Sequence, residues 1–206
     1  MLEIIVISIL VIILLVIILN KKIQESEINL GEKEVKNILN KIEGYKLIND
    51  IMIKTEKGTS QIDHILIGRK GIFVIETKDY NGLIYGEEYS KYWTQVLNKR
   101  SNEFYNPIRQ NYGHIKSLER CLKRKNIFIS VIVFTNKSNL KIGTTETTVI
   151  QSNKLKKFIK KYNSDIKLSK NEIIEIYNII KKSNIQSSKV RKKHIEEIIK
   201  NISWGI

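Results

Sequence analysis

Cysteine, proline and histidine are scarce in this chain of 206 residues, and the scarcity narrows what the protein can be. Cys121 is the one cysteine, so the chain can form neither an internal disulfide framework nor a zinc site built on several thiolates. The three histidines, His64, His114 and His194, show no pair with the short spacing of metal ligands. These features suit a protein of a reducing compartment.

Acidic residues are few compared with basic ones. Lys and Arg total 36 against 21 Asp and Glu, which gives a formal net charge of +15 at pH 7. Such an excess favours polyanions or an anionic membrane surface as partners. The sequence is also rich in Lys, Ile and Asn, so compositional bias remains an alternative explanation for part of the excess. The length fits one globular domain with a small appendage.

One long stretch is almost free of charge: residues 2–19 are apolar except for Glu3 and Ser8. As a helix rising about 1.5 Å per residue, this run nearly crosses a hydrocarbon core of about 30 Å. It has neither the basic start nor the small-residue cleavage site of a signal peptide. We therefore predict a transmembrane anchor over residues 1–22, although a buried core helix is the alternative. Lys21 and Lys22 then place the rest of the chain in the cytoplasm.

Hydrophobic periodicity predicts the elements that follow a polar linker over residues 23–29. An amphipathic helix is expected over 31–43, and Asn106-Pro107 is typical of the start of another helix, with its buried stripe over 108–122. Two strands are apolar on both faces, as in the interior of a covered sheet: 61–67 and 72–78. Further strands are expected at 45–53, 83–85, 92–95, 127–134 and 147–150, and further helices at 154–162, 170–182 and 188–201.

This order of elements predicts an α/β fold in which helices flank a mixed central sheet. The core domain is expected over residues 30–150. Residues 151–206 form a helical C-terminal extension, which is basic because 14 Lys and Arg stand against five Asp and Glu from residue 154 onward.

The tight-turn signature Gly68-Arg69-Lys70-Gly71 joins the two central strands. If the turn centres on its two middle residues, paired residues have numbers that sum to 139. This register places Asp63 opposite Glu76, and Gln61 opposite Lys78. Cross-strand partners have Cβ atoms about 5 Å apart, and residues two apart in a strand share a face. The four side chains are therefore expected on one face of the hairpin.

Two carboxylates at such a distance repel each other unless a cation bridges them or one is protonated. Carboxylate oxygens suit a hard ion such as Mg²⁺ or Mn²⁺, which can bind a scissile phosphate and activate a water. Lys78 could stabilise the charge that develops on the phosphate. Glu32 lies at the edge of the buried face of the first helix, so its carboxylate is expected to point inward as a further ligand.

The sequence resembles the nuclease-related domain (NERD) family over about residues 30–135. The resemblance is carried by motifs that occur in order along the chain: Gly31-Glu32 at a helix start, Gln61-Ile62-Asp63-His64, Gly71-Ile72-Phe73-Val74-Ile75-Glu76-Thr77-Lys78, Asn81-Gly82, Trp93, Asn106-Pro107-Ile108-x-Gln110 and Val133-Phe134. That family is similar to the PD-(D/E)-x-K nuclease superfamily, so the resemblance implies a restriction-endonuclease-like fold and metal-dependent cleavage of DNA, or of RNA.

The resemblance also implies roles for individual residues. Glu32, Asp63, Glu76, Lys78 and Gln110 match catalytic positions or positions near the site. Among them, the three acids match the ligands of Mg²⁺ or Mn²⁺. The implied enzyme is a hydrolase of phosphodiester bonds, tethered to the membrane by its N-terminal helix.

Each of these residues also has an ordinary structural explanation. Asp63 and Lys78 could form a buried salt bridge, and the Glu76-x-Lys78 spacing is common at strand ends. Glu32 could be a first-turn acid favoured by the helix dipole, and Gln110 and His114 could be a polar flank of the core. His64 points away from Asp63 by strand alternation and is left out of the site. The aromatic residues Tyr80, Tyr85, Tyr92 and Trp93 could stack on bases or pack at a sheet edge.

The basic extension has two interpretations besides that of solvated helix faces. Its segment 189–193 could bind nucleic acid through Lys189, Arg191, Lys192 and Lys193, with Gln61 as a further contact, or it could bind the anionic inner leaflet. Three function classes therefore remain open: a membrane-anchored nuclease, a silent nucleic-acid-binding or scaffold module, and a membrane-surface clamp for a partner protein.

Overall fold

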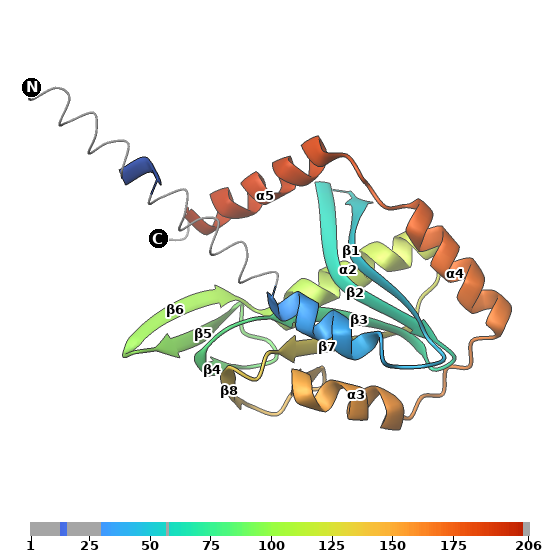
Figure 1. Ribbon diagram of the computed structural model, residues 1–206, viewed down its shortest axis with the longest axis horizontal. Coiled ribbons are helices and arrows are strands. Elements are labelled where there is room, and N and C mark those ends of the chain that lie inside the picture. Colours follow the sequence, from blue (N-terminus) through green and yellow to red (C-terminus); the bar gives the residue numbers. More distant parts are fainter. Residues whose placement is uncertain (1–12, 16–29, 57, 204–206) are drawn as a thin grey trace, which may run out of the picture.

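The computed structural model of the protein describes residues 13–15, 30–56 and 58–203, and a five-stranded sheet lies at its centre (Figure 1). The strand order is β1-β2-β3-β7-β9, in which β1, β2 and β3 are antiparallel and β7 and β9 run parallel to β3. The mixed sheet is therefore confirmed. Its strands are β1 Lys46–Thr55, β2 Gly58–Gly68, β3 Gly71–Lys78, β7 Phe128–Phe134 and β9 Thr148–Gln151.

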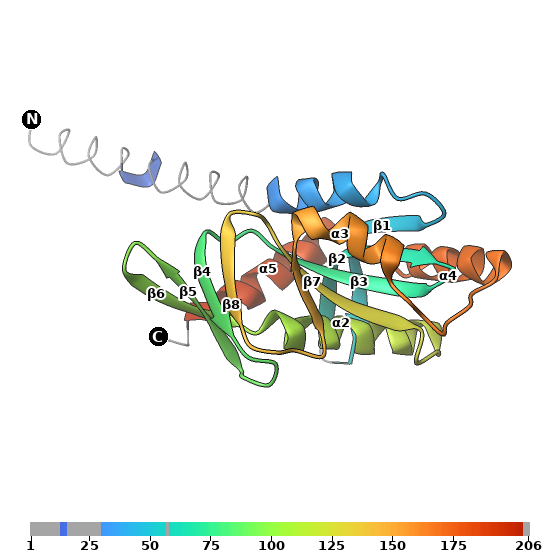
Figure 2. The same cartoon turned by 90° about the horizontal axis from the view of Figure 1, so that it is seen from below.

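Helices cover both faces of this sheet, as the apolar central strands require. β3 is buried along its length up to Thr77, because both of its faces carry apolar side chains. One face packs against α2 (Pro107–Leu122) and α4 (Lys170–Lys182). The other face packs against the helix over residues 30–39 and α3 (Ser152–Lys161). Figure 2 shows these last two helices above the sheet and α2 below it.

A second, four-stranded sheet with the order β6-β5-β4-β8 adjoins the first. The sequence analysis did not predict β6 or β8. β6 is exposed and largely polar, and in β8 the alternation is limited to Leu140 and Ile142. Trp93 joins the two sheets by stacking on Phe134 at 6.2 Å between ring centroids. The strands are β4 Gly82–Gly86, β5 Tyr92–Leu97, β6 Arg100–Tyr105 and β8 Ser138–Ile142.

The start of α2 is the predicted one. The Asn106 side chain accepts a hydrogen bond from the backbone N–H of Ile108, and Pro107 occupies the first helical turn. The Asn106 amide also donates to the carbonyl oxygens of Glu87, Glu88 and Ser90, which fixes the β4–β5 loop against the beginning of α2.

The C-terminal part of the chain belongs to the same core. α3 and α4 contribute Leu155, Ile159, Ile173, Ile176 and Ile180 to the two hydrophobic clusters of the sheet. After α4, the backbone N–H of Ile185 donates to Met52 O at 2.7 Å, and Asn184 Oδ1 accepts from Met52 N at 3.0 Å. The last helix, α5 (Ser188–Ser203), is thereby held beside the edge strand β1.

The predicted anchor over residues 1–22 and the linker over 23–29 fall, apart from residues 13–15, outside the described part of the chain. Within the described ranges, no helix is long and apolar enough to span a membrane.

Candidate active site at the fork between β2 and β3

The site lies where β2 and β3 separate. The β2–β3 register runs from Gly68↔Gly71 to His64↔Ile75, which confirms the predicted pairing as far as that point. Beyond this point the register of β2 and β3 stops, and a side chain connects the two strands instead. Asp63 Oδ2 accepts a hydrogen bond from the backbone N–H of Thr77 at 2.8 Å. Asp63 and Glu76 are therefore not paired in the β2–β3 register as predicted. The strands separate here, at a point that we call the fork, and both side chains lie near it.

The partner strand β1 is distorted at the same level. The β1–β2 register passes from Asn49↔His64 to Ile51↔Ile62 and leaves out Asp50 and Asp63. Asp50 has φ +48°, a conformation that non-glycine residues adopt seldom and chiefly as Asn or Asp. Asp63 is thus left out of the β1–β2 register, and its carboxylate bonds to the backbone of Thr77 on β3.

On β3, Glu76 and Lys78 point to the face covered by α2. Lys78 Nζ donates to Glu76 Oε1 at 2.7 Å and to Gln110 Oε1 at 3.0 Å. Both β3 side chains are well buried, with exposed fractions of 3% for Glu76 and 16% for Lys78. Gln110 thus contacts the ammonium group of Lys78.

A second hydrogen-bond chain reaches Glu76 from α2. His114 Nε2 lies 3.2 Å from Glu76 Oε2, and His114 Nδ1 lies 2.6 Å from Ser60 Oγ. An ionised carboxylate can only accept, so His114 Nε2 donates to Glu76, while His114 Nδ1 and the Ser60 hydroxyl form a second hydrogen bond. His114 and Ser60 therefore fix the position of the Glu76 carboxylate.

Glu32 reaches the fork from the opposite side of the sheet, on the helix over residues 30–39. The preceding Gly31 explains how this helix comes so close. A Cβ at Gly31 would lie 2.6 Å from Asp79 Cβ and 3.2 Å from Thr135 Cγ2. Asp79 directly follows Lys78, so the lack of a side chain at Gly31 lets the helix start touch the end of β3.

The charged residues at the fork fall into two pairs. The ionised forms of Asp63 and Glu32 are disfavoured, whereas Glu76 and Lys78 form an ion pair. Burial, then the charges of Glu76 and Glu32, raise the pKa of Asp63 well above its usual value. Burial, then the charges of Asp50 and Glu76, raise the pKa of Glu32. Glu76 thus acts electrostatically on both Asp63 and Glu32, and Glu32 acts on Asp63.

Glu76 and Lys78 respond in the opposite way. Burial alone would raise the pKa of Glu76, but Lys78 and His114 outweigh it and lower that pKa to about 2. Burial alone would lower the pKa of Lys78, but the charge of Glu76 outweighs it and leaves the pKa above its usual value. At neutral pH the fork thus holds an ionised Glu76 and a charged Lys78.

The residues predicted only for nucleic-acid binding lie elsewhere. Gln61 does not face Lys78; its amide donates to Asp50 Oδ1 at 2.9 Å. Arg191 is occupied as well, since its Nη1 donates to Asp50 Oδ1 and Oδ2 at 2.8 and 2.9 Å. Lys189, Lys192 and Lys193 lie on the exposed part of α5.

Sequence reasoning had weighed His114 as a polar flank and had not considered Ser60. The signal for His114 was its spacing of four from Gln110, which places both on one side of α2. Ser60 gave no signal, because its contact with His114 spans 54 positions. His64 is buried beside Asn49, with 2.8 Å between His64 Nδ1 and Asn49 Oδ1, and burial lowers its pKa to about 4.

The donor chemistry of the fork suits a hard cation. Asp63 and Glu32 are carboxylates whose ionisation is opposed by other carboxylates, and a divalent ion relieves such repulsion. Glu76 is already paired with Lys78 and His114. Within the described ranges, no group of three or more His, Cys, Asp or Glu side chains is placed so that it could hold a metal ion. Asp63 and Glu32 are thus the acids of the fork whose ionisation a bound cation would favour.

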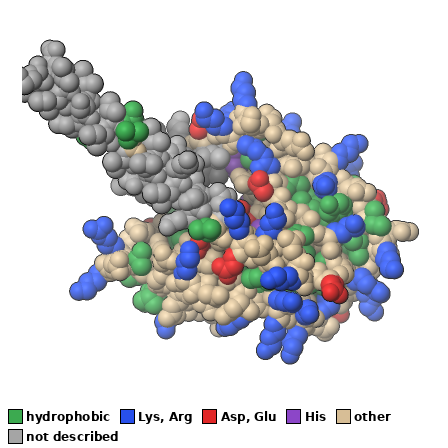
Figure 3. Space-filling model, in the orientation of Figure 1, with side chains coloured by type: hydrophobic (Ala, Val, Ile, Leu, Met, Phe, Trp, Pro, Cys, Tyr) green, Lys and Arg blue, Asp and Glu red, His purple; other side chains and the backbone are tan. Residues whose placement is uncertain are grey.

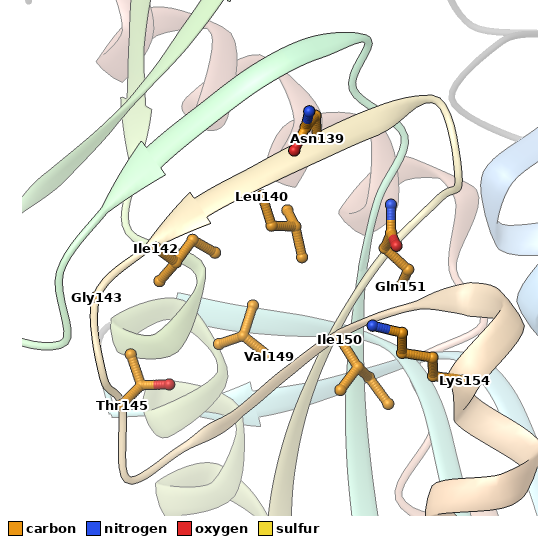
Figure 4. A pocket seen from close by; sticks show the side chains of 9 residues that line it. All are labelled: Asn139, Leu140, Ile142, Gly143, Thr145, Val149, Ile150, Gln151 and Lys154. Atoms are coloured by element: carbon orange, nitrogen blue, oxygen red, sulfur yellow. The ribbon is translucent and has the colours of Figure 1, made fainter.

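The cavity shown in Figure 4 is separate from the fork. It encloses about 310 Å³ beside β8 and β9, and its lining contains none of the predicted site residues. Leu140, Ile142, Val149 and Ile150 give it an apolar wall, with Asn139, Gln151 and Lys154 among its polar residues.

The chain is similar in sequence to known proteins over the part that contains the fork. Residues 29–135, which contain the whole fork, match the nuclease-related domain family. An uncharacterised protein of Bacillus anthracis is 37% identical over 184 residues, a match that covers 86% of each chain. No solved structure matches the chain. The matched span includes Glu32, Asp63, Glu76, Lys78 and Gln110 at the positions described above, and the chain belongs to the nuclease-related domain family.

Proposed function

We propose that the protein is a divalent-metal-dependent nuclease that hydrolyses phosphodiester bonds, in DNA in preference to RNA. The observation that carries the proposal is the charge arrangement at the fork. A charged Lys78 is fixed between Glu76 and Gln110, beside the two carboxylates of Asp63 and Glu32, whose repulsion a cation would relieve. Family membership supports the same reaction class.

In hydrolysis a water oxygen bonds to phosphorus, the bond from phosphorus to the leaving oxygen breaks, and the water's proton is lost while the leaving oxygen gains one. Mg²⁺ or Mn²⁺ held by Asp63 and Glu32 would supply Lewis-acid polarisation of the phosphate. Lys78 stays protonated because Glu76 raises its pKa, so its role is to stabilise negative charge and not to accept the proton. Gln110 and His114 position Lys78 and Glu76.

The test is a cleavage assay on the full chain in detergent, with linear, circular and single-stranded DNA and with RNA, in Mg²⁺, Mn²⁺ or EDTA. We expect metal-dependent cleavage that Lys78→Ala reduces by about 10²–10³-fold, the usual effect of removing one charge-stabilising donor. Lys156→Ala, which removes an exposed lysine of α3, is the matched control and should leave the rate unchanged. Calorimetric titration with Mn²⁺ should show weaker binding by Asp63→Ala.

A folded protein that binds DNA but cleaves none of these substrates would overturn the nuclease proposal. It would favour the alternative of a silent nucleic-acid-binding module. The pairing of Glu76 with Lys78 and His114 is the feature that speaks for this alternative, because these side chains satisfy one another without a metal.

We also propose that residues 1–22 attach the protein to a membrane, with the fork on the cytoplasmic side. The support is the apolar run over residues 2–19, followed by Lys21 and Lys22. Membrane fractionation of cells that produce the chain should recover it with the membranes after an alkaline wash. Release into the supernatant by that wash would contradict an anchor. The basic segment of α5 remains a second proposed contact with the anionic leaflet.

A further inference from the structure

Four tyrosines are exposed around the beginning of α2, and no hydrophobic cluster of the described chain includes them. Their exposed fractions are large for aromatic side chains: 78% for Tyr89, 46% for Tyr92, 45% for Tyr105 and 60% for Tyr112. By contrast, Trp93 is 1% exposed, and Tyr80 packs on Phe104 at 4.6 Å between ring centroids. The exposed rings are thus not part of the sheet packing.

Three structural links join these tyrosines into one surface. The Asn106 amide binds the carbonyl oxygens of the β4–β5 loop on either side of Tyr89. Arg109 Nη1 donates to Tyr89 O at 3.3 Å, which ties the same loop to α2. The rings of Tyr92 and Tyr105 meet edge to face at 6.3 Å. Figures 1 and 2 show α2 beginning beside the small sheet.

Basic side chains alternate with the rings. Arg109, Tyr112 and Lys116 recur along α2 at spacings of three and four, so they share one side of the helix. Lys116 Nζ lies 5.1 Å from the centre of the Tyr112 ring, and Lys91 Nζ lies 5.1 Å from that of Tyr92. Lys116 also pairs with Glu119 at 2.8 Å, so Arg109 and Lys91 provide most of the free positive charge.

The surface and the fork share helix α2. Arg109 directly precedes Gln110, which contacts Lys78, whereas Tyr112 lies two residues from both Gln110 and His114 and therefore on another side of the helix.

We propose that the aromatic–basic surface formed by Tyr89, Lys91, Tyr92, Tyr105, Arg109 and Tyr112 binds single-stranded nucleic acid. Unpaired bases stack on exposed aromatic rings, while basic groups track the phosphates. The bases of a duplex are stacked on one another and cannot offer their faces. The proposal rests on the proposed nuclease function and specifies its substrate as a strand with unpaired bases.

The test measures binding by the full chain in detergent and in EDTA, so that no cleavage occurs. Fluorescence anisotropy would compare labelled single-stranded DNA and RNA of 20 nucleotides with a duplex of the same sequence. We expect tighter binding of the single strands. Tyr112→Ala should weaken single-strand binding by about fivefold or more, as loss of one stacking platform does, and Tyr112→Phe should retain it because the ring remains.

The matched control is Ile174→Ala, which removes an apolar side chain of α4 that is 48% exposed and remote from α2 in sequence. Unchanged single-strand affinity of Tyr112→Ala, an equal loss in Ile174→Ala, or equally tight duplex binding would overturn the proposal. So would loss of affinity in Tyr112→Phe.

Cleavage by the same proteins in Mn²⁺ separates this proposal from the proposed function. Ring-dependent binding without cleavage by the unaltered chain would support the surface and reject the nuclease. Cleavage that Lys78→Ala abolishes, together with full single-strand affinity of Tyr112→Ala, would reject the surface and support the nuclease.

Discussion

At the scale of the residue, Asp63 and Glu76 illustrate opposite responses to burial. Glu76 has strong partners, so its folded pKa of about 2 lies below its ordinary 4.5. Its contribution to stability is therefore present above about pH 4.5 and is lost as the pH falls toward 2. Asp63 has a folded pKa above its ordinary 3.8. Its burial as an acid therefore costs folding free energy, and this cost grows as the pH rises from about 3.8 to the folded pKa.

Asp63→Asn is accordingly expected to stabilise the fold while impairing function. The amide removes the charge but keeps an oxygen that can accept from the Thr77 N–H. In EDTA at pH 7 we expect a gain on the order of 1 kcal/mol, or about 2–4 °C in melting temperature for a chain of this size. The gain should shrink below about pH 4, where Asp63 is protonated in both the folded and the unfolded state.

Thermal unfolding from pH 3 to 8 measures this effect, with Asp165→Asn, at an exposed position, as the control. Addition of Mn²⁺ should raise the melting temperature of the unaltered chain more than that of Asp63→Asn, since a ligand of the folded state stabilises it. A variant that is less stable than the unaltered chain at pH 7 would show that Asp63 is not under charge repulsion.

At the scale of the element, the position of the helix over residues 30–39 depends on Gly31. The approach to Asp79 leaves no space for a methyl group, because the nearest side-chain atom would lie at 2.6 Å. This contact sets where the helix starts, and therefore where Glu32 stands relative to Glu76 and Lys78.

Gly31→Ala should thus destabilise the protein by about 1–3 kcal/mol, the usual cost of overpacking, and should reduce cleavage by moving Glu32. Gly113→Ala is the matched control, since a Cβ there meets nothing within 4 Å. That variant should be more stable by about 0.5–1 kcal/mol through its helix propensity. Urea denaturation of both variants is the measurement, and equal effects of the two substitutions would refute the steric argument.

The elements also show which parts of the fold can be predicted from the sequence. Strands β2, β3 and β7, the turn at 68–71 and the start of α2 are predictable, because their signals are local: apolar runs, turn glycines and an Asn-Pro cap. Strand β6 is not, because its polar residues pair with β5 across a hairpin whose Asn98 and Lys99 adopt positive φ without any glycine.

At the scale of the whole molecule, the excess of positive charge is spread widely. Figure 3 shows lysine and arginine side chains scattered over the visible face, with few acidic ones between them. A net charge of +15 attracts polyanions from every side. On the C-terminal helix, Arg191 pairs with Asp50, whereas Lys192 is exposed.

Lys192→Ala is expected to alter binding without altering stability. Each phosphate contact adds about 0.7 to the slope of log affinity against log salt for single strands. We expect Lys192→Ala to reduce that slope by about this amount, with an unchanged melting temperature. Arg191→Ala should instead lower the melting temperature, since it removes the hydrogen bonds that attach α5 to β1.

Anisotropy titrations of single-stranded DNA at several salt concentrations test this expectation, with Lys156→Ala on α3 as the control. An identical slope for Lys192→Ala and the unaltered chain would identify the exposed lysines of α5 as an ordinary solvated helix face.

The sequence by itself determined the hairpin of β2 and β3 and singled out the charged residues at its open end. The apolar hairpin fixes its own register through its turn, and Asp63, Glu76 and Lys78 stand out because charges inside a two-sided strand require partners. Only the tertiary structure decided which partners these are. His114 and Ser60, the approach of Gly31 to Asp79 and the pairing of Arg191 with Asp50 join residues far apart in the chain. No local periodicity encodes such contacts, because they depend on how separate elements pack.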